Sequence, residues 1–179
     1  MILYFVRHGE TEYNKHHQLM GQRIDAPLDS QGLEQANQVI PKLPKDFAMI
    51  YCSPLKRALQ TAQAIADFFN KNIAVSQDIR ERDFGTLSGE TWEQIDEETK
   101  LALSKEDANL TYDYTPYGGE SALQVKDRLT RFIEELQSKH QNDTLVVVTH
   151  YGIISMMNSI HPNGENHSYT NSSIHKFEI

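Results

Sequence analysis

The sequence predicts an α/β fold, a three-layer α/β/α sandwich around a mostly parallel central sheet. Two observations support this prediction. Short runs of consecutive apolar residues are typical of strands that are covered on both faces. These runs alternate along the chain with longer segments whose apolar residues recur at helical spacing. The 179 residues contain no internal repeat, low-complexity tract or Gly/Ser linker, so we expect a single domain over residues 1–179.

The first half of the chain contains three predicted strands and two predicted helices. The strands are residues 2–6, 48–51 and 73–75, and the helices are residues 29–40 and 53–69. Pro41 and Pro44 end the first helix, because proline cannot continue a helical hydrogen-bond ladder. Ser53 is the expected N-cap of the second helix, with Pro54 at its first helical position. Arg57 would then lie in the first turn, close to the end of the preceding strand.

The second half of the chain begins with a charged loop, "IRERDFGTLSG", which follows the strand at 73–75. A polar helix is expected at 91–105 and a strongly amphipathic one at 121–139, separated by a turn-rich aromatic stretch. The run "TLVVVTHYGII" predicts a buried strand that leads directly into a helix. The last segment, "IHKFEI", predicts a closing strand.

Composition and charge exclude several classes of protein. The formal net charge of −8 argues against a nucleic-acid-binding protein, which needs a basic face, but it leaves room for a small anionic substrate. A single cysteine, Cys52, rules out an intramolecular disulfide and a cysteine-built zinc site, and we expect it to be buried. The apolar start at residues 2–6 is too short to span a membrane, so we expect a cytoplasmic protein without a membrane partner. The sequence carries no signal for oligomeric state.

Basic residues follow three of the predicted strands at the point where each strand ends. Arg7 and His8 follow the first strand, Arg57 the second, and His150 follows "LVVVT". Carboxyl ends of parallel strands meet at one edge of a sheet, so these side chains should converge. Two like charges about 4 Å apart repel by about 4 kcal/mol near a protein surface, unless an anion lies between them. The fork of an arginine matches phosphate oxygens, and the cluster therefore predicts a phosphate pocket.

A histidine in such a pocket can act as a nucleophile, because nearby positive charge favours its neutral form. We expect His8 to attack phosphorus in line and form a phosphohistidine that water then hydrolyses. His150 would donate a hydrogen bond to the equatorial oxygens in the transition state. Glu81, in the charged loop, is the candidate that protonates the leaving group and later deprotonates water.

Each of these residues, taken singly, has a structural explanation. A lone histidine after a strand is more often structural than catalytic, Arg57 alone suggests a solvated helix residue, and Glu81 lies among other charges that suggest an exposed turn. Four residues of matching chemistry at the ends of strands make the pocket the better interpretation.

These motifs resemble the histidine phosphatase superfamily, also called the phosphoglycerate mutase-like family, over nearly the whole chain. The matching segments are "RHGETEYN", "GQRIDAPLDSQGLEQA", "CSPLKRALQTA", "RERDFGTLSG", "GGES" and "VVVTHYG". Arg-His-Gly alone is weak evidence, but its place after an apolar N-terminal strand makes the match specific. The resemblance implies the phosphoglycerate mutase-like fold.

The resemblance also implies roles for individual residues. His8 would be the phosphorylated nucleophile and Glu81 the proton donor. The phosphate would be held by Arg7, Arg57, His150 and, from the first loop, Asn14. Arg23, near the entrance, is a candidate substrate contact. The resemblance implies no metal or organic cofactor, and metal-ligand spacing is also missing from the other histidines, His16, His17, His161, His167 and His175.

Two departures from the family pattern concern the substrate. Tyr151 stands where many members carry glycine, which would narrow the mouth of the pocket. The chain is also shorter than the mutase branch, and a more open pocket would admit water, so a phosphatase is favoured over a phosphoglycerate mutase. A non-catalytic phospho-ligand-binding module is a third alternative. Candidate substrates are sugar phosphates, phosphoglycerates and the nucleotide-loop phosphate of cobamide synthesis, and the sequence does not rank them.

Residues 88–119 are expected to form a lid over the active site. Their aromatic residues either line a substrate surface or, as the better-supported alternative, pack the lid against the domain; they are Trp92, Tyr112, Tyr114 and Tyr117. The polar stretch at 161–173 would either close over the pocket or connect to the last strand.

Overall fold

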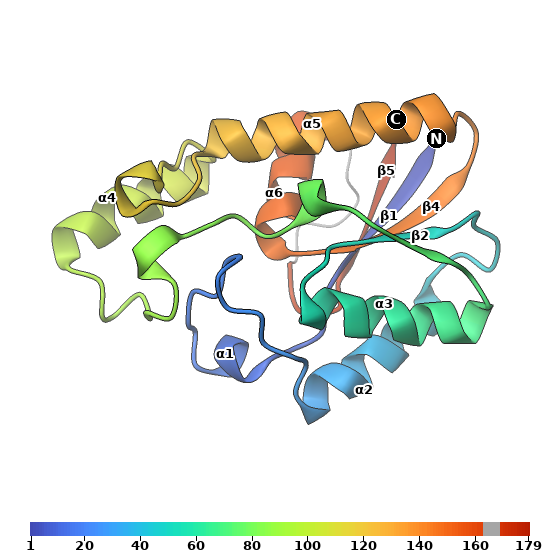
Figure 1. Ribbon diagram of the computed structural model, residues 1–179, viewed down its shortest axis with the longest axis horizontal. Helices are drawn as coiled ribbons and strands as arrows, with labels where there is room; N and C mark the ends of the chain where they lie inside the picture. Colours follow the sequence, from blue (N-terminus) through green and yellow to red (C-terminus); the bar gives the residue numbers. More distant parts are fainter. Residues whose placement is uncertain (163–168) are drawn as a thin grey trace.

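The computed structural model of the chain contains a five-stranded sheet with helices on both of its faces (Figure 1). It describes residues 1–162 and 169–179. The strand order is β3-β2-β4-β1-β5, in which β5 runs antiparallel to β1 and every other neighbour is parallel. The predicted α/β sandwich with a mostly parallel sheet is therefore confirmed.

The strands follow the apolar runs of the sequence closely. Their bounds are β1 Ile2–Arg7, β2 Ile50–Cys52, β3 Ile73–Val75, β4 Thr144–Thr149 and β5 Ile174–Glu178. β2 begins two residues later than predicted, because Ile50 is the first residue in register with both of its neighbouring strands. In the central pair, Arg7 lies opposite Thr149. The residues that follow them, His8 and His150, therefore leave the sheet side by side.

The described part of the chain contains six α-helices. They are α1 Glu12–Lys15, α2 Ser30–Val39, α3 Lys56–Phe69, α4 Glu97–Asn109, α5 Ala122–Lys139 and α6 Tyr151–Ile160. α2 and α3 cover one face of the sheet, and α5 and α6 cover the other (Figure 1). Alternate residues of β4 face the two layers: Val146 and Val148 pack toward α2 and α3, and Leu145 and Val147 toward α5 and α6. None of these helices is both long and apolar enough to cross a membrane.

Two predicted helix starts are wrong. α3 begins at Lys56 with Leu55 as its N-cap; the Ser53 hydroxyl accepts the Leu55 amide at 3.4 Å and lies 2.7 Å from His150 Nε2. Arg57 still lies in the first turn, as predicted. α4 begins at Glu97 rather than at residue 91, because the Asp96 carboxylate accepts the Thr99 amide at 3.0 Å and so caps the helix at that point.

The turn-rich stretch between α4 and α5 contributes to the core. Tyr112 and Tyr114 are 1% and 0% exposed, and the Tyr114 ring packs edge-on against Phe84 at 5.0 Å between centroids. Packing is therefore the correct alternative for these two tyrosines, whereas Trp92 is only half-buried. Cys52 is buried as predicted, and burial raises the pKa of its thiol, so it is not poised to react.

Candidate active site

His8 follows β1 and is held at the carboxyl edge of the sheet by its backbone. Its amide donates to the Thr149 carbonyl at 3.0 Å, which ties it to β4. The next residue must be glycine, because a Cβ atom on Gly9 would lie 2.4 Å from the Gly32 carbonyl oxygen. The His8 ring is 2% exposed in the resulting pocket.

The contacts of the His8 ring leave one nitrogen available as a nucleophile. Nδ1 lies 2.6 Å from the Gly9 carbonyl oxygen, which can only accept, so Nδ1 carries the proton. Nε2 therefore keeps a lone pair, and it accepts a hydrogen bond from Arg57 Nε at 3.2 Å. Burial, and then the positive charges of Arg57 and Arg7, hold the pKa of His8 well below its usual range. The ring is therefore neutral at physiological pH.

Arg57 projects from the first turn of α3 and is completely buried. Its Nη2 and Nη1 atoms donate to the carbonyls of Gly21 and Ile24, at 2.9 and 3.1 Å, so the loop after α1 fixes its orientation. Burial lowers the pKa of Arg57 to about 10, which still leaves it charged at neutral pH. A fixed cation thus lies in contact with the candidate nucleophile.

His150 lies next to His8, with 5.1 Å between the ring centroids. It is completely buried, and its Nε2 atom lies 2.7 Å from the Ser53 hydroxyl. Its Nδ1 atom is buried without a hydrogen-bond partner among the described residues, as is Nε of Arg7. Burial, followed by the charge of Arg57, lowers the pKa of His150 well below its ordinary value. An anion bound beside the two rings would supply acceptors for such groups.

Glu81 is buried, although its neighbours in the sequence are charged. Its Oε1 atom accepts the Arg82 amide at 2.9 Å, and the Gly152 amide in the first turn of α6 lies 3.1 and 3.2 Å from its two carboxyl oxygens. A Cβ atom at position 152 would lie 2.4 Å from Oε1, so a larger residue there would displace the carboxylate from this position. The N-terminus of α6 therefore anchors this carboxylate at the edge of the pocket.

A cavity of about 270 Å³, here called the inner pocket, lies against these residues. Of the seven residues that the sequence analysis singled out, the five that line the inner pocket are Arg7, His8, Asn14, Arg57 and Glu81. His150 does not line it, but its ring lies beside that of His8 at a tilted angle. Arg23 lies outside the inner pocket, because its guanidinium pairs with Asp83 at 2.8 Å and contacts the Gly118 carbonyl.

The sequence analysis missed a second buried cation of the inner pocket, Arg82. Its guanidinium forms a two-point ion pair with Asp107 of α4, at 2.8 and 3.0 Å, and lies 4.6 Å from the centroid of the Tyr112 ring. Burial lowers the pKa of Arg82, but the charge of Asp107 more than offsets this and the net shift is upward. Arg82 and Asp107 are separated by 25 positions in the chain, so no local pattern predicts the pair.

The segment before β5 supports the backbone of Arg7 and His8 and was also missed. The Ser172 amide donates to the carbonyls of Arg7 and His8 at 3.1 and 3.2 Å, and the Asn171 side chain donates to the His8 carbonyl at 3.2 Å. Asn171 also donates to Asn14 Oδ1 at 3.3 Å, which links this segment to the first loop. Asparagine and serine in a polar loop give no sequence signal for such support.

The two buried neutral histidines predict a loss of stability in acid. The folded-state pKa values of His8 and His150 lie below their unfolded value of 6.5, so the unfolded chain binds more protons below that pH. Both contributions are fully present above pH 6.5 and are lost as the pH falls toward the folded-state pKa values. Each histidine should lower the free energy of unfolding by about 1.4 kcal/mol per pH unit in that window.

Urea denaturation at a series of pH values, followed by circular dichroism, measures this slope. The variant His8→Asn should reduce the slope by about one proton. An unchanged slope in this variant would contradict a neutral, buried His8 in the folded state.

The described residues contain no group of three His, Cys, Asp or Glu side chains arranged to hold a metal ion. The ionisable side chains that the site does bring together are the histidines, arginines and carboxylates described above.

Comparisons with known proteins bear on the same residues and the same fold. The family model of the histidine phosphatase superfamily (branch 1) matches residues 3–177. The chain is 36% identical over 152 residues to phosphoglycerate mutase-like protein 4 and to metal-independent phosphoserine phosphatase, both of Arabidopsis thaliana. Each match covers 83% of this chain, which spans 66% and 63% of the length of those two relatives.

A solved structure extends the likeness to three dimensions. It is a mutant of phosphoserine phosphatase from Entamoeba histolytica in complex with phosphoserine, 30% identical with a TM-score of 0.82. The alignment covers 99% of this chain and 90% of that one.

Proposed function

The chain belongs to the histidine phosphatase superfamily, and we propose that it is a metal-independent phosphomonoesterase that hydrolyses a small phosphorylated metabolite through a phosphohistidine on His8. The observation that supports this most directly is the His8 ring. It is neutral, its Nδ1 proton is fixed on Gly9, and Arg57 lies against the remaining lone pair. A ring in this state can attack phosphorus without first losing a proton.

In the first step, His8 Nε2 forms a bond to phosphorus while the bond from phosphorus to the ester oxygen breaks. Glu81 in its acid form gives a proton to the departing alkoxide. In the second step water attacks phosphorus, Glu81 takes the proton of that water, and the bond from phosphorus to Nε2 breaks. Inorganic phosphate and the neutral ring are regenerated, so the cycle needs no cofactor.

The remaining residues would stabilise the charge that moves during both steps. Arg7, Arg57 and Asn14 line the inner pocket together with His8, and the His150 ring lies beside the His8 ring, which supports a role for all four in binding the phosphoryl group. The buried donors of Arg7 and His150 that have no partner among the described residues suit phosphate oxygens. Arg23 is a weaker candidate for a substrate contact, since Asp83 holds it away from the inner pocket.

Residues 88–119 are proposed as a lid within one histidine phosphatase domain over 1–179. Trp92 and Asp107, both from this segment, line the inner pocket. The pairing of Asp107 with Arg82 ties α4 to the loop that carries Glu81. The polar stretch at 161–173 was expected either to close over the pocket or to connect to the last strand, and its residues 163–168 lie outside the described residues. A cytoplasmic location stays a prediction, as does the absence of nucleic-acid and membrane partners.

Incubation with p-nitrophenyl phosphate tests the proposal. We expect release of phosphate that is unaffected by EDTA, because the proposed steps use only residues of the chain. Denaturing the enzyme during turnover should trap an acid-labile phosphate on one histidine, found by mass spectrometry.

The other two candidates give different results in the same assays. A phosphoglycerate mutase, favoured by the name of one plant relative, would interconvert 2- and 3-phosphoglycerate with a bisphosphate primer and release little phosphate. A non-catalytic binding module would bind inorganic phosphate without forming phosphohistidine.

A further inference from the structure

A second cavity, of about 790 Å³, adjoins the inner pocket and is here called the outer chamber. The two cavities share five lining residues, which are Arg7, Asn14, Gln18, Trp92 and Tyr151. If a phosphoryl group binds against His8, the rest of the substrate has to extend into the outer chamber. The lining of this chamber therefore bears on the chemistry of the leaving group.

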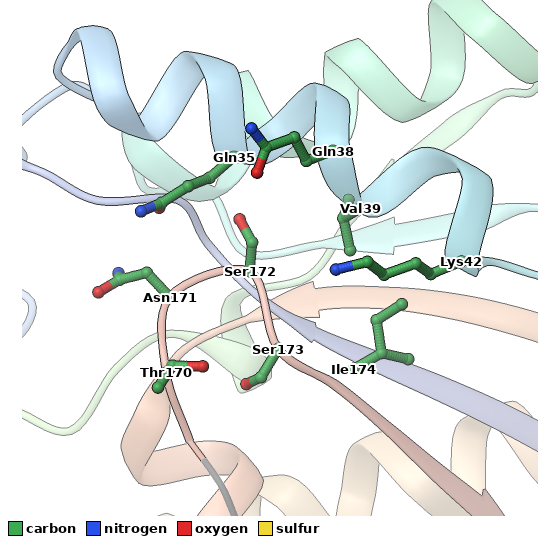
Figure 2. A pocket seen from close by; sticks show the side chains of 9 residues that line it. All are labelled: Gln35, Gln38, Val39, Lys42, Thr170, Asn171, Ser172, Ser173 and Ile174. Carbon is green, nitrogen blue, oxygen red and sulfur yellow. The ribbon is translucent and has the colours of Figure 1, made fainter.

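Aromatic rings and amide side chains dominate the outer chamber. The rings are those of Trp92, Tyr151 and Tyr169, and the amides are those of Asn14, Gln18, Gln35 and Asn171. The rings of Tyr151 and Tyr169 pack edge to face at 5.3 Å, so these two rings support each other. The amides of Gln35 and Asn171 extend to the same side of the segment before β5 (Figure 2).

Positive charge is scarce in the outer chamber. Arg7 is the one lysine or arginine of its lining among the described residues, and Arg7 also lines the inner pocket, where the phosphate is proposed to bind. The charge of Arg82, in the inner pocket, is already paired with Asp107. Lys42 does not line the outer chamber but a neighbouring cavity between α2 and the segment before β5, which shares Gln35, Thr170 and Asn171 with it (Figure 2).

This distribution of charge disfavours an anionic leaving group. A carboxylate or second phosphate in the outer chamber would lose hydration and meet no lysine or arginine besides Arg7, with His17 as the other basic side chain of the lining. The Glu10 carboxylate in the same lining would repel it. A hydroxylated ring meets no such penalty. Its apolar face can pack on an aromatic side chain, and its hydroxyl groups can donate to and accept from the amides.

We infer that the substrate carries a neutral, hydroxylated ring, sugar-like in chemistry, as its leaving group, with the phosphoryl group as its only anion. The inference rests on the proposed phosphatase function and narrows its substrate class. It also separates this chain from its phosphoserine phosphatase relatives, because the substrate in their names carries a carboxylate and an ammonium group.

Steady-state kinetics on paired substrates test the inference. The neutral group consists of esters whose leaving group is uncharged: ribose 5-phosphate, glucose 6-phosphate and adenosine 5′-monophosphate. Comparing the first two with the third shows whether a sugar or a nucleoside is preferred. The anionic group consists of substrates that carry a carboxylate or a second phosphate besides the reacting phosphoryl group: phosphoserine, 3-phosphoglycerate and fructose 1,6-bisphosphate. We expect kcat/KM for the best neutral substrate to exceed that of every anionic one by about tenfold or more. A preferred anionic substrate would overturn the inference.

Two variants locate the preference in the outer chamber. Trp92→Ala should lower kcat/KM for the best neutral substrate by about tenfold, mainly through KM, and leave inhibition by inorganic phosphate unchanged.

Gln18→Lys adds a cation while keeping a donor for the Gly89 carbonyl, which Gln18 now bonds at 3.0 Å. It should raise kcat/KM for 3-phosphoglycerate by about tenfold, and the uncharged control Gln18→Met should not. If Gln18→Lys has no such effect, charge in the chamber does not set the preference.

Turnover of p-nitrophenyl phosphate by the same preparation distinguishes failure of the proposed phosphatase function from failure of the inference about the leaving group. If that ester is not hydrolysed, the proposed phosphatase function itself is wrong. If it is hydrolysed and an anionic metabolite is the best substrate, the phosphatase function stands and only the inference about the leaving group fails.

Discussion

His8→Ala should lower kcat for every phosphate ester by about 10⁴-fold or more, which is the scale seen when an enzyme loses its covalent nucleophile. The substitution removes the imidazole ring and with it Nε2, the atom that accepts a hydrogen bond from Arg57 and is proposed to attack phosphorus. No neighbouring side chain can replace it, because the adjacent His150 is engaged with Ser53 and does not line the inner pocket. Phosphate release measures the loss, and the trapped phosphoenzyme should disappear with it.

The matched control is His16→Ala, which removes an exposed histidine whose ring contacts only Glu12 among the described residues. We expect it to leave kcat unchanged. Inorganic phosphate should still protect His8→Ala against thermal unfolding, because Arg7 and Arg57 remain. If His8→Ala kept activity within about tenfold of the wild type, His8 would not be the nucleophile.

The strands β1, β2 and β4 could be predicted from sequence because each is a run of mostly apolar residues that is largely buried on both faces, whereas β3 and β5 are edge strands that are partly exposed. β1 and β4 show this best, since their interior residues Val6, Val147 and Val148 are completely inaccessible. The helix starts were harder to predict. Both Ser53 and Asp96 are good capping residues, and the sequence does not show that α3 starts only at Lys56, after Ser53 has bonded both the Leu55 amide and His150.

The convergence of His8, Arg57 and His150 could be predicted for the same reason, because parallel strands deliver their ends to one edge of the sheet. The burial of charged side chains could not be predicted from the sequence. The sequence does not distinguish Arg82 from Arg23 in this respect. Arg82 lines the inner pocket and pairs with Asp107, whereas Arg23 lies outside the pocket and pairs with Asp83. Which carboxylate an arginine meets depends on how α4 packs, and that is a property of the whole fold.

Glu81→Gln should lower steady-state kcat by about 10² to 10⁴-fold, the range for loss of a general acid and base. Glutamine has the same shape and can still accept the Gly152 and Arg82 amides that hold Glu81 in place, so the fold should survive. The two proposed roles of Glu81 predict different effects on two kinds of ester. An alkyl phosphate needs a proton on its leaving oxygen, whereas p-nitrophenolate is a weak base that leaves without one.

Stopped-flow mixing of Glu81→Gln with p-nitrophenyl phosphate should therefore show a burst of about one product per enzyme, followed by slow turnover as the phosphohistidine waits for an activated water. A sugar phosphate should show no burst, because its first step is blocked. Glu34→Gln, on the exposed face of α2, is the matched control and should behave as wild type. If Glu81→Gln slowed formation and hydrolysis of the phosphohistidine equally for both esters, Glu81 would be a positioning residue and not the acid and base. In that case the burst with p-nitrophenyl phosphate would also be lost, because Gly152 packs directly on this carboxylate and the N-terminus of α6 would be displaced.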